Sequence, residues 1–390
     1  MEQPGIKSEN SRNRPEASGT QTNPKGIADF ANNDGQIRTI ASGHPKNKVE
    51  NPNLSVTDNQ QGNAFACPRL NMATALQSDI DLRQEVATLR KEQRNAHGFA
   101  HIGGTYALLI ATFWCMKHYP EWWVYTLAWF MIGFMQYRLV MSTHEAVHKT
   151  LVYPTWLNEF FGVFHSALVG ISFFNYRKTH LEHHKNPQSI DEDIDSYIYR
   201  PLLEAKPGLP RLFLLVFGVV NDVAMKLRRK LFGAKRRSDE TVVKNPTPLW
   251  QQLVPVLLCQ AGLIAFFSLY LQWWHYLVFW IPPIFLIALS LDRARTFLEH
   301  GYQYIFSNQT WESFKEAPQS TIDVDTNPLE RFFFAPYGFA YHQAHHTYLT
   351  VPFYNLPRLA NLLESRDEQY FHRVKGSYVL ILAKMIWARK

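Results

Sequence analysis

Three clusters of histidine stand out in this sequence of 390 residues. They read HEAVH, HLEHH and HQAHH, and their histidines are His144, His148, His180, His183, His184, His342, His345 and His346. Residues three and four positions apart lie on one face of an α-helix, so we expect the imidazoles of each cluster to converge on a common point. Imidazole suits iron, copper, zinc and nickel. Eight such ligands exceed the four positions of one tetrahedral zinc, so the clusters predict a site for two metal ions.

The first cluster alone leaves other interpretations open. HExxH on a helix is also the pattern of zinc proteases, in which two histidines bind zinc and the glutamate, here Glu145, acts as general base. The other two clusters disfavour a protease, because that class of site needs only one further protein ligand and an open position. An intramembrane zinc protease and a metal-structured scaffold without catalytic activity remain as alternatives.

A ninth histidine, His300, is expected to join the site. It follows an apolar segment by one or two helical turns, so it would emerge beside the other clusters. His165 lies on an apolar stretch between the first two clusters and is a weaker candidate. A structural role is the simpler interpretation of the remaining histidines, which are His44, His97, His101, His118, His275 and His372.

Imidazoles that bind a metal need their second nitrogen held, usually by a carboxylate or a carbonyl. The nearby carboxylates are Glu145, Glu182, Asp191, Glu192, Asp193, Asp195 and Glu299. For Asp191 and Glu192 a solvated acidic loop explains the sequence equally well. Asp193 and Asp195 are preferred, because residues two apart face the same way in an extended segment.

The elements that must position these residues are apolar enough to cross a bilayer. Four segments have the required length of about 20 residues, or about 17 in short cases, at approximately 103–119, 122–141, 250–271 and 275–291. Short turns join them in pairs. The predicted fold class is therefore an all-α integral membrane protein with four transmembrane helices in two hairpins. Two further apolar stretches, 157–174 and 212–220, are expected to be interfacial or re-entrant helices.

The distribution of Lys and Arg predicts which side the clusters face. The segment between the hairpins, 142–249, is rich in both residues, whereas the first hairpin turn has only Lys117 and the second has none. By the positive-inside rule, this segment and both termini are cytoplasmic. All three clusters then lie on the cytoplasmic side, where a helical cap would hold the two-metal site.

Composition divides the chain into three parts. Residues 1–60 are polar and are expected to be a disordered tail, 61–102 an amphipathic segment before the membrane, and 103–390 the membrane domain with its cap. In the second part, 79–94 alternates charge with Leu82, Val86 and Leu89 at helical spacing, which is typical of a helix lying on the membrane surface. Three isolated cysteines give no disulfide framework.

The net charge of +7 does not predict nucleic-acid binding. The densest basic cluster has no interleaved aromatic residues of the kind that stack on bases. Its members are Lys226, Arg228, Arg229, Lys230, Lys235, Arg236 and Arg237. Beside a membrane, such a cluster suits anionic headgroups or an acidic electron donor, and the sequence does not separate the two.

From about residue 97 to 363 the sequence resembles the membrane fatty acid desaturase family. The resemblance rests on the three histidine clusters, or boxes, in combination. It also rests on the run Asn175, Tyr176, Arg177 before the second box and on the sequence from Val351 to Pro357 after the third. His300 resembles the additional ligand of such enzymes. Thr296 stands where some relatives have Asn, so a contact made by that Asn cannot be carried over.

The resemblance implies a diiron centre held by the histidines, which uses O₂ to oxidise a lipid or fatty acyl substrate. We therefore expect a fatty acid desaturase that introduces a C=C bond. A hydroxylase or ketolase of the same family is the alternative. A desaturase removes hydrogen from two adjacent carbons, whereas these enzymes return oxygen to the first carbon, and the sequence does not separate the two outcomes. The sequence holds no haem-binding HPGG, no GxGxxG and no iron–sulfur cysteine cluster. Electrons are expected from a separate protein such as ferredoxin or cytochrome b5.

Overall fold

The structure is a computed structural model that describes residues 72–185, 189–232, 247–316, 321–366 and 373–389. Within these ranges the side chains of 72–79, 185, 221 and 224–232 are not described. The predicted disordered tail, His44 and His372 lie outside the described residues. The basic cluster of 226–237 lies outside the described side chains.

Helices dominate the described residues, in agreement with the predicted all-α class. The elements are α1 (Met72–Lys91), α2 (Asn95–His118), α3 (Trp122–Val147), α4 (Thr155–Leu168), α5 (Phe173–Lys185), α6 (Ser196–Glu204), α7 (Leu209–Phe232), α8 (Leu249–Tyr270), α9 (Trp273–His275), η1 (Tyr276–Trp280), α10 (Ile281–Pro283), η2 (Ile284–Ala288), α11 (Leu289–Phe306), α12 (Trp311–Glu316), β1 (Asp323–Asp325), α13 (Pro328–Phe333), α14 (His342–Thr347), η3 (Phe353–Asn355), α15 (Leu356–Arg366), β2 (Arg373–Lys375) and α16 (Tyr378–Trp387). The two short strands pair in parallel, with Val324 opposite Val374.

Three helical segments of the described chain are long and apolar enough to cross a membrane. They are α2, α8 and the continuous helix Trp273–Phe306, which comprises α9 to α11. The last one passes through two π-helical stretches around Pro282 and Pro283, because proline removes a backbone donor and shifts the hydrogen-bond register. This continuity carries the chain directly from the apolar segment to His300.

The second predicted span, 122–141, forms most of α3. This helix is less apolar than the three segments above and is not among the candidate spans. Polar residues such as Gln136 and Arg138 and several aromatic residues lower its hydropathy. Both of these polar side chains are fully buried by neighbouring protein. The helix is therefore long enough to span, at 26 residues, but its second half is a protein interior rather than a lipid-facing surface.

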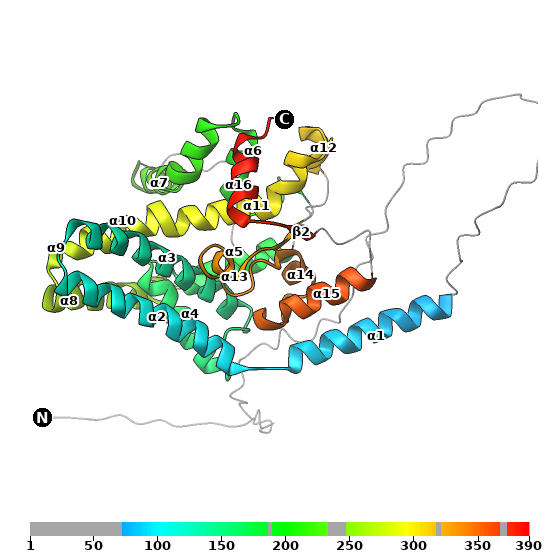
Figure 1. Cartoon of the computed structure of the whole chain (residues 1–390), viewed down its shortest axis with the longest axis horizontal. Coiled ribbons are helices and arrows are strands. Elements are labelled where there is room, and N and C mark those ends of the chain that lie inside the picture. Colours follow the sequence, from blue (N-terminus) through cyan, green and yellow to red (C-terminus); the bar gives the residue numbers. More distant parts are fainter. Residues whose placement is uncertain (1–71, 186–188, 233–246, 317–320, 367–372, 390) are drawn as a thin grey trace, which may run out of the picture. The chain divides into compact units, whose positions relative to one another are not determined.

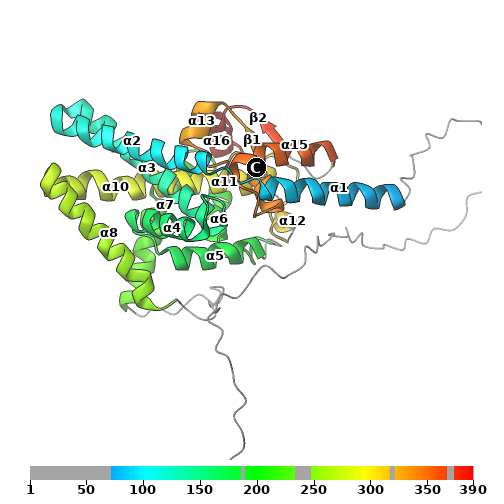
Figure 2. The ribbon, with the colours of Figure 1, turned by 90° about the horizontal axis from the view of Figure 1, so that it is seen from below.

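Helix α3 lies at the centre of the described fold. It packs along α2, along α4 and along the continuous helix that contains η2 (Figures 1 and 2). Farther along that continuous helix, α6 and α16 both pack against α11 (Figure 1). Helix α8 is covered by protein far less than the other two candidate spans, since only 6% of its most apolar stretch is buried. Such an apolar and uncovered helix is typical of a surface that faces lipid.

The predicted apolar stretch 157–174 forms α4 and the start of α5, which meet at an angle of 104°. The turn between them frees the carbonyls of Ala167 and Leu168 from helical bonding. The side-chain amide of Gln260 on α8 donates to both, at 2.7 and 2.9 Å, and the indole of Trp280 donates to Leu168 at 3.0 Å. A break of this kind is tolerated at membrane depth because neighbouring helices satisfy the freed groups.

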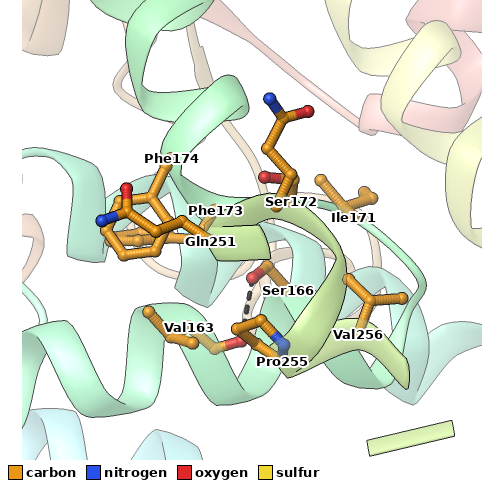
Figure 3. Close-up of a pocket in the computed structure, with 10 residues that line it drawn as sticks. Val163, Ser166, Ile171, Ser172, Phe173, Phe174, Gln251, Pro255 and Val256 are labelled. Carbon is orange, nitrogen blue, oxygen red and sulfur yellow. Dashed lines mark hydrogen bonds between the residues drawn. The ribbon is translucent and has the colours of Figure 1, made fainter. Parts of the chain in front are cut away.

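A small pocket adjoins this turn, between it and the first turns of α8 (Figure 3). Ser166 and Ile171 line it from the α4–α5 side, and Pro255 and Val256 from α8. Its interior has no room for a water-sized molecule. Ligand sites usually enclose roughly 300 Å³ or more, so we do not assign a substrate to it.

The apolar stripe of α1 is covered by protein, not by the membrane surface that we expected to cover it. Val86 and Leu89 are buried, at 2% and 5% exposure. The amide of Asn355 donates to the carbonyl of Leu89 at 2.8 Å, and Arg366 pairs with Glu85 at 2.9 Å. The stripe therefore docks α1 onto η3 and α15.

Candidate metal centre

Four helices bring the nine predicted histidines together. His144 lies in the last turn of α3 and His148 directly after it, whereas His180, His183 and His184 lie on α5. His300 lies on α11, and His342, His345 and His346 lie on α14. Every one of these side chains is buried or half-buried.

Five of the histidines form a larger group. It consists of His144, His148, His180, His184 and His345, each of which offers a nitrogen within 4.8 Å of the others. The Nε2 atoms of His148 and His180 are 3.0 Å apart, and those of His184 and His180 are 2.9 Å apart. A set of nitrogens this close can surround one metal ion.

The other four histidines form a smaller group. His183, His300 and His346 offer nitrogens within 4.8 Å of one another. His342 adjoins them, since its Nε2 lies 3.2 Å from that of His300 and its ring 4.4 Å from the ring of His346. The two groups are neighbours, with the rings of His184 and His346 4.4 Å apart.

The expectation that each box converges on one point holds for the first box, whose His144 and His148 both belong to the larger group, but is wrong for the other two. On α5, His180 and His184 belong to the larger group and His183 to the smaller one. On α14, His345 belongs to the larger group and His346 to the smaller one. Adjacent residues on a helix point about 100° apart at 3.6 residues per turn, so one box reaches two neighbouring points.

The chemistry of these side chains fits bound metal. Three imidazole nitrogens of these groups are buried without any hydrogen-bond partner among the described residues. They are His144 Nε2, His345 Nε2 and His346 Nε2. A buried polar atom without a partner is costly, and metal coordination would satisfy it. Burial and then nearby positive charge hold the pKa of His345 and His346 well below the usual value. The neutral ring has the lone pair that a metal requires.

Two of the predicted carboxylates hold the outer nitrogen of a histidine. Asp193 Oδ1 accepts from His183 Nδ1 at 2.6 Å, and Glu145 Oε1 lies 3.1 Å from His144 Nδ1. Burial opposes ionisation of Asp193, but its hydrogen bond with His183 outweighs this effect and lowers the pKa of the carboxyl. An ionised Asp193 fixes the proton of His183 on Nδ1. The Nε2 atom of His183 is then free of a proton and faces the smaller histidine group.

The remaining carboxylates behave differently. Glu299 Oε2 lies 3.3 Å from His342 Nε2, the nitrogen that also faces His300, and it accepts from Arg295 at 2.5 Å. The backbone N–H of Asp195 donates to Asp193 at 2.9 Å, so Asp195 acts through the main chain. Asp191 forms a surface ion pair with Arg200, Glu192 is exposed, and Glu182 is half-buried on α5.

Glu145 is placed unlike the general base of a zinc protease. One carboxylate oxygen contacts His144 Nδ1, and the other accepts from the hydroxyl of Thr150 at 2.8 Å. The carboxylate is therefore on the outer side of His144 and has no free oxygen directed at a metal-bound water.

The other described histidines have structural contacts, as expected. His165 is fully buried, but its Nδ1 lies 2.7 Å from the Ser142 hydroxyl and it belongs to neither group. The other rings contact aromatic neighbours, in the pairs His97–Tyr354, His101–Tyr337, His118–Trp114 and His275–Trp274. Thr296 donates to the carbonyl of Asp292 at 2.9 Å within its own helix.

Two residues have supporting roles that the sequence did not predict. Asn158 is fully buried, and its amide donates to the carbonyl of Ala146 and accepts from the N–H of Leu151, which fixes the chain around His148. Asp323 on β1 accepts from the backbone N–H groups of Gln343 and Ala344, at 2.7 and 3.3 Å, in the first turn of α14. Asn158 lies just after the first box, but Asp323 is distant from the box it supports, so only the fold reveals it.

Comparison with known proteins agrees with this arrangement. The sequence model of the family described as fatty acid desaturase matches residues 120–377, more than half of the chain. The sn-1 acyl-lipid omega-3 desaturase (ferredoxin) of Nostoc sp. (strain 36) is 26% identical over 68% of this chain and 75% of the relative. The dihydrorhizobitoxine desaturase of Bradyrhizobium elkanii is 24% identical over 76% and 82%. The matched region contains all nine histidines, and the chain belongs to the fatty acid desaturase family of oxidoreductases.

Proposed function

We propose that this enzyme is an O₂-dependent acyl-lipid desaturase whose nine histidines hold two iron ions. The single observation that carries this proposal is the division of the histidines into two adjoining groups, each with buried and unpartnered nitrogens. Iron in these groups would supply the redox chemistry with O₂ that oxidises an unactivated C–H bond, which zinc does not provide.

The protein residues have separate tasks in this proposal. His144, His148, His180, His184 and His345 hold one iron, and His183, His300, His342 and His346 hold the other. Asp193 and Glu145 orient His183 and His144 from outside. Arg295 is buried between Glu299 and Asp292 and pairs with both, so its single positive charge offsets part of the negative charge beside the smaller group.

We infer the substrate class from the candidate membrane spans of the chain and from the names of its relatives. The spans place the chain in a membrane, and relatives are named as acyl-lipid desaturases. We propose that the substrate is a fatty acyl chain of a membrane lipid, and that α2–α3 and α8–α11 form two hairpins beneath a cytoplasmic cap that carries the site.

The electron donor is proposed to be a separate, acidic protein. Two relatives carry ferredoxin in their names, which favours a ferredoxin over cytochrome b5. The basic cluster of 226–237 would offer it an electrostatic docking face. Arg229→Glu combined with Arg236→Glu is expected to slow electron delivery more than substrate binding, and unchanged kinetics with the donor would reject this face.

Expression in a host with a simple lipid profile tests the reaction. Desaturation removes two mass units from a fatty acyl chain, whereas hydroxylation adds sixteen, so mass spectrometry of the extracted lipids separates the two outcomes. Metal analysis of the purified protein tests the centre. About two irons per chain supports the proposal, one zinc would support a protease, and absence of any metal would reject the metal centre.

A further inference from the structure

The smaller histidine group has an outer support that joins two of its histidines from different helices. Tyr199 on α6 is fully buried, and its hydroxyl donates to Asp193 Oδ2 at 2.8 Å. The other oxygen of Asp193 accepts from His183. The ring of Tyr199 stacks on His300, with centroids 5.1 Å apart and planes 15° apart. One side chain therefore contacts two histidines of the group, one through Asp193 and one directly.

Helix α6 is held firmly where it provides this support. The N–H of Asp195, just before α6, donates to Asp193 Oδ1 at 2.9 Å. Leu202 and Leu203 are buried on the same helix, and Leu203 packs so closely on α11 that a Cβ added at Gly301 would lie 2.9 Å from it. The helix thus ties His183 of α5 to His300 of α11, two residues that are far apart in the sequence.

The larger group has a comparable ring, but among the described residues this ring lies on the same helix as the histidine that it contacts. Tyr176 stacks on His180, with centroids 5.4 Å apart and planes 18° apart, but both residues lie on α5. This contact cannot fix one helix relative to another. The larger group also has five imidazoles with mutually close nitrogens, whereas the smaller one has three together with the adjoining His342. Fewer ligands leave the smaller group more dependent on the groups that orient them.

We propose that Tyr199 is a positioning residue for the smaller histidine group, and that the metal in this group is the first to be lost when the support is removed. The inference rests on the proposed metal centre. With Asp193 held by Tyr199, His183 keeps its proton on Nδ1 and directs Nε2 inward, while the stacked ring limits rotation of His300. Loss of such outer contacts typically weakens metal binding by about 10- to 100-fold.

Metal release from the full-length protein in lipid nanodiscs tests the inference. The protein is loaded anaerobically with two equivalents of Fe²⁺, a chelator is added, and the metal remaining per chain is followed with time. Tyr199→Phe keeps the stacked ring and removes only the hydroxyl, and it is expected to lose one equivalent about 10- to 100-fold faster than the wild type. The second equivalent should leave at the wild-type rate. Tyr176→Phe is the matched control and should release both metals as the wild type does.

Asp193→Asn provides a second variant in case Tyr199→Phe does not fold. It keeps the shape of the side chain but removes the charge that fixes His183, so it should show the same selective loss. Equal acceleration of both equivalents, or wild-type release from both variants, would overturn the role of Tyr199 and leave the metal centre intact. Failure of the wild-type protein to bind two metals would instead overturn the proposed function.

Discussion

At the scale of residues, burial determines what the histidines can do. An exposed histidine is ordinarily half-charged near neutral pH, but the imidazoles of this site are withdrawn from water and crowd one another. The pKa of His342 and that of His345 are therefore lowered, first by burial and then by neighbouring charges. These two rings are thus already in the form that binds metal at neutral pH. His183 differs, because its hydrogen bond with Asp193 outweighs the effect of burial and raises its pKa.

Replacement of one ligand should abolish the reaction without unfolding the protein. His345 is the residue through which α14 reaches the larger group, with its ring 4.9 Å from that of His144 and 4.6 Å from that of His148. His345→Ala is expected to insert in the membrane normally but to produce no desaturated lipid and to retain less iron. His118→Ala, which alters a ring stacked near Trp114 far along α2, is the control. Wild-type turnover of His345→Ala would remove this histidine from the centre.

Stability should depend on pH through Asp323. Burial raises the pKa of this carboxyl to about 7, despite the two backbone N–H groups that it accepts from. The folded protein therefore keeps a proton that the unfolded chain releases near pH 4, and the free energy of unfolding falls as the pH rises between about 4 and 7. Asp323→Asn still accepts both N–H groups but does not titrate. Its stability relative to the wild type should rise with pH, by at most about 1.4 kcal/mol per unit.

Thermal unfolding in detergent at pH 5, 6 and 7 measures this difference. The comparison of the two proteins at each pH cancels the titration of the histidines, which both share. A constant difference across the three pH values would show that Asp323 does not take up a proton on folding.

At the scale of elements, the turn between α4 and α5 determines where the second box lies. The turn depends on Gln260, which donates to two freed carbonyls and accepts from the hydroxyl of Tyr276 at 2.7 Å. The amide thus joins α8, the turn and the last long helix at one position. Without it, the carbonyl of Leu168 keeps the indole of Trp280 and that of Ala167 keeps the N–H of Gly170, and each hydrogen bond lost costs about 0.5–1.5 kcal/mol.

Gln260→Leu should therefore lower the melting temperature and reduce iron content together, because a displaced turn displaces α5. Gln251→Leu is a matched control on the same helix, since Gln251 lies in the first turns of α8 beside the pocket of Figure 3. Unchanged stability and iron content in Gln260→Leu would show that the turn holds its shape without this amide.

The sequence predicted the elements better than it predicted their contacts. Helical spacing and apolar length identified the histidine boxes and three candidate spans, because both depend on local periodicity. It did not reveal that α1 docks on protein, because a buried stripe and a lipid-covered stripe have the same spacing. Nor did it reveal that Asp323 supports α14 or that Tyr199 contacts His300, since these contacts join distant parts of the chain.

At the scale of the whole molecule, the histidines lie in a protein interior on or next to α3, α5, α11 and α14, whereas α8 carries an apolar surface that the described protein leaves uncovered. Arg138 on α3 belongs to this interior. It is fully buried and donates to the carbonyl of Phe332 at 2.8 Å, a residue of α13. The exposed apolar residues of α8 contrast with this interior. We expect the bilayer to cover α8 and the cap to lie outside it.

Labelling of single cysteines tests the proposed orientation. In a variant without the native cysteines, Glu121→Cys probes the exposed turn between α2 and α3, and Lys206→Cys probes the exposed segment before α7. A membrane-impermeant maleimide added to intact cells should label position 121 and should label position 206 only after lysis. Labelling of position 206 in intact cells would reverse the orientation or add a crossing between the two sites.

The way in which α5 and α14 each serve both histidine groups has a consequence for how such a centre can change. A rotation or a one-residue shift of either helix would disturb both ion positions at once, so neither position can be remodelled alone through these helices. Loss of the second or the third box would therefore remove histidines from both groups, whereas loss of the first box, His144 and His148, would affect the larger group alone.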